Sequence, residues 1–129
     1  MSKQTPAPTK DSQELMRAVQ NKNFLLKQFS QQRVLLEEKK NLKRRSEFTL
    51  KELEPIEDEA VTYRAIGRMF LKDSLPDVRI EIQTIIDETA QEIQKLEKTV
   101  EQLDQRVRES EADVREMLAQ QQQTNVVAK

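Results

Sequence analysis

The sequence has 129 residues, of which 35% are charged and only 4% aromatic, with one Gly and neither Cys nor His. This composition is typical of long helices or a coiled coil, and it excludes disulfides, thiolate metal sites and any chemistry that needs an imidazole group. Twenty-two basic and 23 acidic residues leave a formal net charge of −1, which argues against a general phosphate-binding surface.

The chain begins with a polar, proline-containing segment, and residues 1–11 are predicted to be a disordered tail. Asp11 and Glu14 have the spacing of a capping box, so we expect a helix over residues 12–47. Steps of four and three residues along it select a stripe that is apolar at first and mostly charged later. The stripe consists of Leu15, Val19, Lys22, Leu26, Phe29, Arg33, Leu36, Lys40, Lys43, Glu47 and Leu50. The helix should therefore form a coiled coil better near its start than near residues 39–45.

A second capping-box pattern, Thr49 with Glu52, predicts a separate short helix over residues 50–57. Pro55 supports a break near this point, because the residue before a proline disfavours the α conformation. An acidic run at residues 57–59 follows, and the period of the apolar residues then changes to that of a strand.

Residues 61–72 are predicted to form a β-hairpin. β-Branched and aromatic residues surround the only glycine, Gly67, which supplies the positive φ that a tight turn needs, and alternation places Val61, Tyr63 and Ala65 on one face. A lone two-stranded hairpin is marginal in water and leaves its edges unpaired. We therefore expect hairpins of several chains to combine in a shared sheet or barrel. The alternative is that the apolar side chains pack against helices of their own chain.

The last helix, predicted over residues 76–122, carries the strongest pattern in the chain. Ser74 and Asp77 have capping-box spacing at its start, with Pro76 in the first turn. Five unbroken heptads follow, and all their a positions are β-branched, which indicates a coiled-coil seam. The a positions are Ile86, Ile93, Val100, Val107 and Val114, and the d positions are Thr89, Leu96, Leu103, Ser110 and Met117. Residues 123–129 are predicted to be a second disordered tail.

Two long helices joined by a hairpin most simply fold back on each other. The sequence therefore predicts a mainly α fold, a long antiparallel two-helix coiled coil with one central β-hairpin, as a single unit over residues 12–122. Burial of one Ile, Val or Leu contributes roughly 1.5–3 kcal/mol, so the seam positions can hold the two helices together.

The hairpin sequence also carries a family resemblance. Residues 63–71, Tyr-Arg-Ala-Ile-Gly-Arg-Met-Phe-Leu, resemble the hairpin of β-class prefoldin subunits, above all the eukaryotic subunit-1 type. Residues 111–118, Glu-Ala-Asp-Val-Arg-Glu-Met-Leu, resemble the C-terminal helix of that type. The resemblance extends over residues 12–120. Subunits of the α class carry two hairpins, and this sequence has room for one.

The resemblance implies a function in protein folding. Prefoldin is a heterohexamer of two α-type and four β-type subunits, with a barrel of hairpins and six coiled-coil arms. It captures non-native proteins such as actin and tubulin and transfers them to the cytosolic group II chaperonin, without using ATP. A cytoplasmic location is therefore expected, with a nuclear pool left open, and no signal peptide or membrane span is evident in the sequence.

Two groups of candidate site residues follow. Residues expected to act in subunit assembly lie in the hairpin: Val61, Tyr63, Ala65, Ile66, Gly67, Met69, Phe70 and Leu71. Residues expected to bind clients lie at the tip of the coiled coil: Leu15, Met16, Val19, Val114, Met117 and Leu118. Flexible, polarizable Met side chains suit promiscuous contacts. The alternative for the second group is that it only packs the tip.

Two other classes of function remain as alternatives. The chain could be a structural coiled-coil subunit of a kinetochore, tethering or cytoskeletal complex, although such a rod has no need of an edge-exposed hairpin. The basic residues Lys39, Lys40, Lys43, Arg44 and Arg45 could bind nucleic acid or act as a nuclear signal. Neighbouring acidic residues and the balanced net charge favour a solvated helix face instead.

No enzyme is predicted. A single glycine cannot form a phosphate-binding loop, and the many carboxylates occupy surface positions of the heptads, where they pair with lysines. We accordingly expect no catalytic residues, no metal, no cofactor, and neither nucleic acid nor membrane as a partner.

Overall fold

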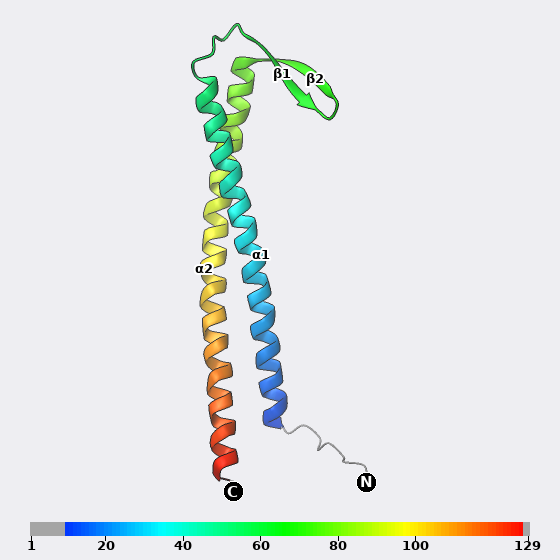
Figure 1. Cartoon of the computed structure of the whole chain (residues 1–129). Helices are drawn as coiled ribbons and strands as arrows, with labels where there is room; N and C mark the ends of the chain where they lie inside the picture. The colour runs from blue at the N-terminus through cyan, green and yellow to red at the C-terminus, as the bar shows by residue number, and fades with distance from the viewer. Residues whose placement is uncertain (1–9, 128–129) are drawn as a thin grey trace. The chain divides into compact units, whose positions relative to one another are not determined.

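The structure is a computed structural model that describes residues 10–127, and it contains two long helices with a hairpin between them in the chain (Figure 1). Their bounds are α1 Lys10–Leu53, β1 Val61–Ile66, β2 Met69–Ser74 and α2 Leu75–Val127. The chain divides into two compact units. The first combines α1 up to Arg33 with α2 from Thr99, and the second is Val34–Lys98, which contains the hairpin.

In the first unit, α2 supplies the buried side of the helix pair. Leu103, Val107, Ser110 and Val114 are buried at heptad spacing, while no residue of α1 is fully buried. The α1 residues of the predicted stripe, such as Leu26, are half-buried instead. The two helices therefore contribute unequally to the seam.

In the second unit, α2 again buries residues at heptad spacing, whereas the stripe of α1 is mostly charged. Ile86, Thr89 and Ile93 are buried, so seven of the ten a and d positions predicted for α2 are buried, and Leu96, Val100 and Met117 are half-buried. On α1 the stripe is basic here, and two lysines reach carboxylates of α2. Lys40 Nζ, in the stripe, lies 3.9 Å from Glu97 Oε1, and Lys39 Nζ, beside the stripe, lies 2.8 Å from Glu92 Oε2. These pairs are solvent-exposed, so each is worth only about 0.2–1 kcal/mol.

The predicted stripe of α1 is wrong at two positions. Arg33 and Glu47 are exposed, and Gln32 and Ser46 take the half-buried places. A straight α-helix drifts relative to a strict seven-residue repeat, so the inward face moves by one residue where no apolar side chain holds it. The Arg33 guanidinium instead lies over the Phe29 ring, 5.5 Å from its centroid.

The predicted separate helix over residues 50–57 is also wrong, because α1 runs without interruption to Leu53. Thr49 does not cap a new helix; its hydroxyl donates to the carbonyl of Arg45 at 2.9 Å, within α1. The helix ends at Leu53, just before Pro55, and its last backbone hydrogen bond runs from the Glu54 N–H to the Leu50 carbonyl at 3.2 Å.

The start of α2 follows the sequence prediction closely, whereas its end does not. The Asp77 N–H donates to Ser74 Oγ at 3.3 Å, which is the expected N-cap, and Leu75 beside it is completely buried. The helix continues through Val127, so the predicted disordered tail is helical over residues 123–127. Residues 1–9 and 128–129, also predicted to be disordered, lie outside the described part of the chain.

The unequal seam predicts that α2 dominates stability. Ile93→Ala removes a side chain that is only 8% exposed and should lower the free energy of unfolding by about 2–5 kcal/mol. Gln94→Ala, on the exposed side of the same turn, should change it by less than about 0.5 kcal/mol. Urea unfolding followed by circular dichroism measures both, and equal effects would contradict the assigned seam.

Candidate functional site

The hairpin in the second unit is closed by a two-residue turn. Ile66 pairs with Met69, and Gly67 and Arg68 form the loop between them. Gly67 has φ of 60°, and no other described residue has a positive φ, which identifies a type II′ turn. A Cβ at Gly67 would meet nothing within 4 Å, so the backbone conformation alone demands glycine here.

The register sorts the hairpin side chains into two faces. Cross-strand partners share a face, so the first face holds the odd-numbered residues of β1 and their partners in β2. The first face consists of Val61, Tyr63, Ala65, Phe70, Lys72 and Ser74, and the second of Thr62, Arg64, Ile66, Met69, Leu71 and Asp73. Every residue of the first face is exposed, including Tyr63 at 64% and Phe70 at 73%.

Both edges of the hairpin are open in the described residues, whose only sheet has two strands. The two residues that flank a two-residue loop, here Ile66 and Met69, form a hydrogen-bonded pair. Hydrogen-bonded and non-hydrogen-bonded pairs then alternate along the two strands. The backbone groups of Val61, Tyr63 and Ala65 on β1, and of Phe70 and Lys72 on β2, therefore point away from the partner strand. Both edges can accept a further strand.

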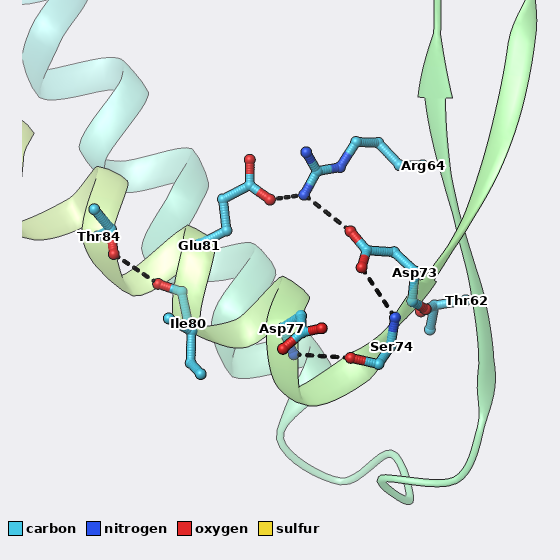
Figure 2. A network of polar contacts seen from close by, with 8 residues as sticks. All are labelled: Thr62, Arg64, Asp73, Ser74, Asp77, Ile80, Glu81 and Thr84. Carbon is cyan, nitrogen blue, oxygen red and sulfur yellow. Dashed lines mark hydrogen bonds and ion pairs between the residues drawn. The ribbon is translucent and has the colours of Figure 1, made fainter.

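A polar network fastens the second face to α2 (Figure 2). The Arg64 guanidinium lies 3.2 Å from Asp73 Oδ2 and forms an ion pair with Glu81 of α2. Asp73 Oδ1 accepts a hydrogen bond from the Ser74 N–H at 3.0 Å, and its carbonyl accepts one from the Thr62 hydroxyl. Arg64 thus ties the second face to α2, whereas Ile66, Met69 and Leu71 of the same face remain exposed, as does the whole first face.

Arg79 of α2 holds the segment between α1 and β1. Its guanidinium donates to the carbonyls of Leu53 at 2.9 Å and Ile56 at 2.6 Å, and it pairs with Asp58. Its Nε is buried without a partner among the described residues. Sequence reasoning missed the contacts of Arg64 and Arg79, because no local pattern shows which acceptor an arginine will reach in another element of the chain.

In the first unit, the six residues predicted to bind clients divide into two groups. Val114 is buried, and Leu15, Val19 and Met117 are half-buried, as members of the seam. Met16 is 59% exposed and Leu118 is 44% exposed, so these two side chains are accessible.

Within residues 10–127, no group of three or more acidic residues is placed to hold a metal ion. Neither α1 nor α2, over the part that the structure describes, has a stretch apolar enough to cross a bilayer.

Comparison with known proteins identifies the family. A model of the family described as Prefoldin subunit matches residues 13–121. The chain belongs to the prefoldin subunit family. This prefoldin chain is 27% identical over 116 residues to prefoldin subunit beta of Methanococcoides burtonii, which covers 87% of the chain and 99% of the relative. The crystal structure of the prefoldin beta subunit from Thermococcus strain KS-1 is 21% identical, covers 90% of this chain and 96% of that one, and has a TM-score of 0.49.

The predicted resemblance to β-class prefoldin subunits is confirmed by these matches. The structure itself confirms the predicted fold class, mainly helical with two long helices and one antiparallel two-stranded hairpin. Prefoldin subunits are non-enzymatic chaperone components that associate with other prefoldin subunits. The assignment to the subunit-1 type stays a prediction.

The turn geometry predicts the effect of a side chain at Gly67. Gly67→Ala should destabilise the hairpin by about 1–3 kcal/mol, because a Cβ is strained at this φ although the space is open. Arg68→Ala, at the other turn position, is the control and should leave the hairpin unchanged. Amide hydrogen exchange of β1 and β2 reports both, and equal protection in the two variants would contradict the assigned turn.

Proposed function

We propose that this chain is a β-type subunit of a heterohexameric co-chaperone with two α-type and four β-type subunits. The complex captures non-native proteins such as actin and tubulin and transfers them, without ATP, to the cytosolic group II chaperonin. The observation that carries this proposal is the hairpin, whose first face is exposed and whose two edges are open. A cytoplasmic location, with a nuclear pool left open, belongs to the same proposal.

Exposure of the hairpin favours assembly over internal packing. Seven of the eight residues proposed for assembly have exposed side chains, and the eighth, Gly67, makes the turn. The seven are Val61, Tyr63, Ala65, Ile66, Met69, Phe70 and Leu71. If these residues served their own chain, its helices would cover them. A two-stranded hairpin with apolar residues on both faces gains most from strands of neighbouring subunits, which satisfy its edges and cover its faces.

Client capture is assigned to the accessible part of the predicted tip group. Met16 and Leu118 are exposed on α1 and α2, where Met provides a flexible and polarizable contact. Leu15, Val19, Val114 and Met117 lie in the seam and contact clients only where the helix pair opens. This arrangement supports weak, adaptable binding of unfolded chains.

The structural coiled-coil alternative is weaker. A rod in a kinetochore, tethering or cytoskeletal complex would share the seam of α2, but it would gain nothing from an open-edged hairpin. The match to the prefoldin subunit family over residues 13–121 points the same way.

Assembly is tested by the native mass of the tagged chain purified with its co-purifying subunits. A complex of about six small chains is expected for the wild type. Tyr63→Ser/Phe70→Ser should abolish it, because truncating an aromatic side chain that becomes buried in a subunit interface costs about 2 kcal/mol or more of binding free energy. Lys72→Ser changes the same face without removing an apolar group, and its complex should persist. A homodimer, or a hexamer unaffected by the double change, would overturn the proposal.

Client capture is tested by suppression of aggregation of chemically unfolded actin by the assembled complex. Met16→Gln/Leu118→Gln should weaken suppression several-fold and leave the native mass unchanged, because both side chains are exposed before substitution. Glu116→Gln, an exposed polar position on the same turn of α2, is the control. Unchanged capture would exclude these two side chains as the client contacts.

A further inference from the structure

The two ends of the hairpin are attached to the helices in different ways. β2 continues directly into α2, because it ends at Ser74 and α2 begins with Leu75, which is completely buried. β1 instead follows a linker, residues 54–60, in which no residue is buried and Ile56 is 40% exposed. Burial therefore fixes the β2 end of the hairpin and leaves the β1 end without an apolar anchor.

The linker has little internal structure of its own. The Ile56 N–H donates to the Leu53 carbonyl at 3.2 Å, and the Ala60 N–H donates to the Glu57 carbonyl at 3.0 Å. Both bonds close single turns, and neither of them reaches another element. The position of the linker relative to the helices must therefore come from contacts made by side chains.

Arg79 of α2 supplies these contacts. Its guanidinium donates to the carbonyls of Leu53 at 2.9 Å and Ile56 at 2.6 Å, at the start of the linker, and it pairs with Asp58 further along. The planar guanidinium presents its donors in a fixed geometry, and hydrogen bonds from a charged donor are stronger than neutral ones. One side chain thus joins the linker to α2 at three points.

The surroundings of Arg79 favour the carbonyl bonds as the stronger part of this contact. The Arg79 side chain is only 25% exposed, and its Nε is buried. Asp58 is 68% exposed, so solvent screens the ion pair and reduces what it contributes. The two hydrogen bonds to backbone carbonyls therefore do most to fix the linker.

The position of the linker matters to a strand that pairs with β1. Val61 follows the linker directly, and its backbone groups point away from β2, toward the side from which such a strand would come. A linker that moved freely would cross this end of the edge, and binding would have to order it first. Ordering a loop on association lowers affinity, and a conformational step before binding lowers the association rate.

We propose that Arg79 is a positioning residue for subunit assembly, which holds residues 54–60 on α2 and so keeps the edge of β1 ready for a strand of another subunit. This inference rests on the proposed assembly through the hairpin. It assigns to Arg79 an effect on the rate of association and no contact with the partner subunit.

The test measures how fast the chain enters its complex. Labelled full-length chain is mixed with the partner subunits that co-purify with it, and fluorescence anisotropy follows association; an excess of unlabelled chain then gives the dissociation rate. Arg79→Met keeps a long side chain and removes every donor. It should lower the association rate constant about fivefold or more, the cost of ordering about one backbone residue. The dissociation rate should change less than about twofold, because no contact with the partner is lost.

Amide hydrogen exchange in the free chain tests the cause of this effect. In Arg79→Met, the amides of Ile56 and Ala60 should exchange faster, because the linker is no longer held, while the amides that pair β1 with β2 should keep their protection. Unchanged exchange at Ile56 and Ala60 would show that Arg79 does not fix the linker and would overturn the inference.

Three further variants serve as comparisons. Arg79→Lys keeps the charge without the planar fork and should fall between the wild type and Arg79→Met, with a smaller change to the fold. Asp58→Asn removes the ion pair alone and should have a smaller effect than Arg79→Met. Arg106→Met makes the same substitution at an exposed position of the first unit and should associate as the wild type does. Circular dichroism should show all variants equally helical.

The outcomes separate this inference from the proposed function. If the wild type enters the complex and Arg79→Met and Arg79→Lys enter it equally fast, the inference is wrong and the proposed assembly stands. A loss of affinity that lies wholly in faster dissociation would also overturn the inference, because it would indicate a lost contact rather than a lost position. A wild-type chain that enters no complex would instead overturn the proposed assembly on which the inference rests.

Discussion

The hairpin depends on the contacts of one arginine near the start of α2. Arg79 donates to the carbonyls of Leu53, the last residue of α1, and of Ile56 in the following segment, and it pairs with Asp58. The segment before β1 is thereby fixed to α2, and β1 starts at a defined place. At its other end the hairpin joins α2 directly, because β2 ends at Ser74 and α2 begins at Leu75, and Arg64 of β1 pairs with Glu81 of α2. The surface proposed for assembly is thus set by polar contacts rather than by a core.

The two helices stabilise the chain by different means. α2 buries apolar side chains such as Ile93 and Val107, while α1 buries none completely and relies on half-buried positions and pairs such as Lys39–Glu92. Several apolar side chains of α1 lie outside the seam and remain exposed, including Met16 and Phe48. Met16, proposed to contact clients, is accessible for this reason.

The sequence predicts those parts of the structure that depend on local or periodic signals. The heptads of α2, the cap at Ser74 and the turn at Gly67 each follow from residues close together in the chain. The continuous helix through Thr49 was missed because a capping pattern is indistinguishable in sequence from a threonine that bonds back to its own helix. Of the candidate sites, the hairpin residues could be chosen from sequence, but exposure of Met16 and burial of Val114 required the packing of both helices. The contacts of Arg64 and Arg79 depend on long-range geometry.

The open edges of the hairpin have a consequence for how the chain is produced. Exposed strand edges with apolar faces promote aggregation, and exposed unfolded or unpaired segments are degraded by cellular proteases. A chain made in excess of its partner subunits keeps both hazards, whereas a chain bound into a closed sheet loses both. An unassembled chain would therefore be more prone to aggregation and to proteolysis than one whose hairpin is covered by strands of other subunits.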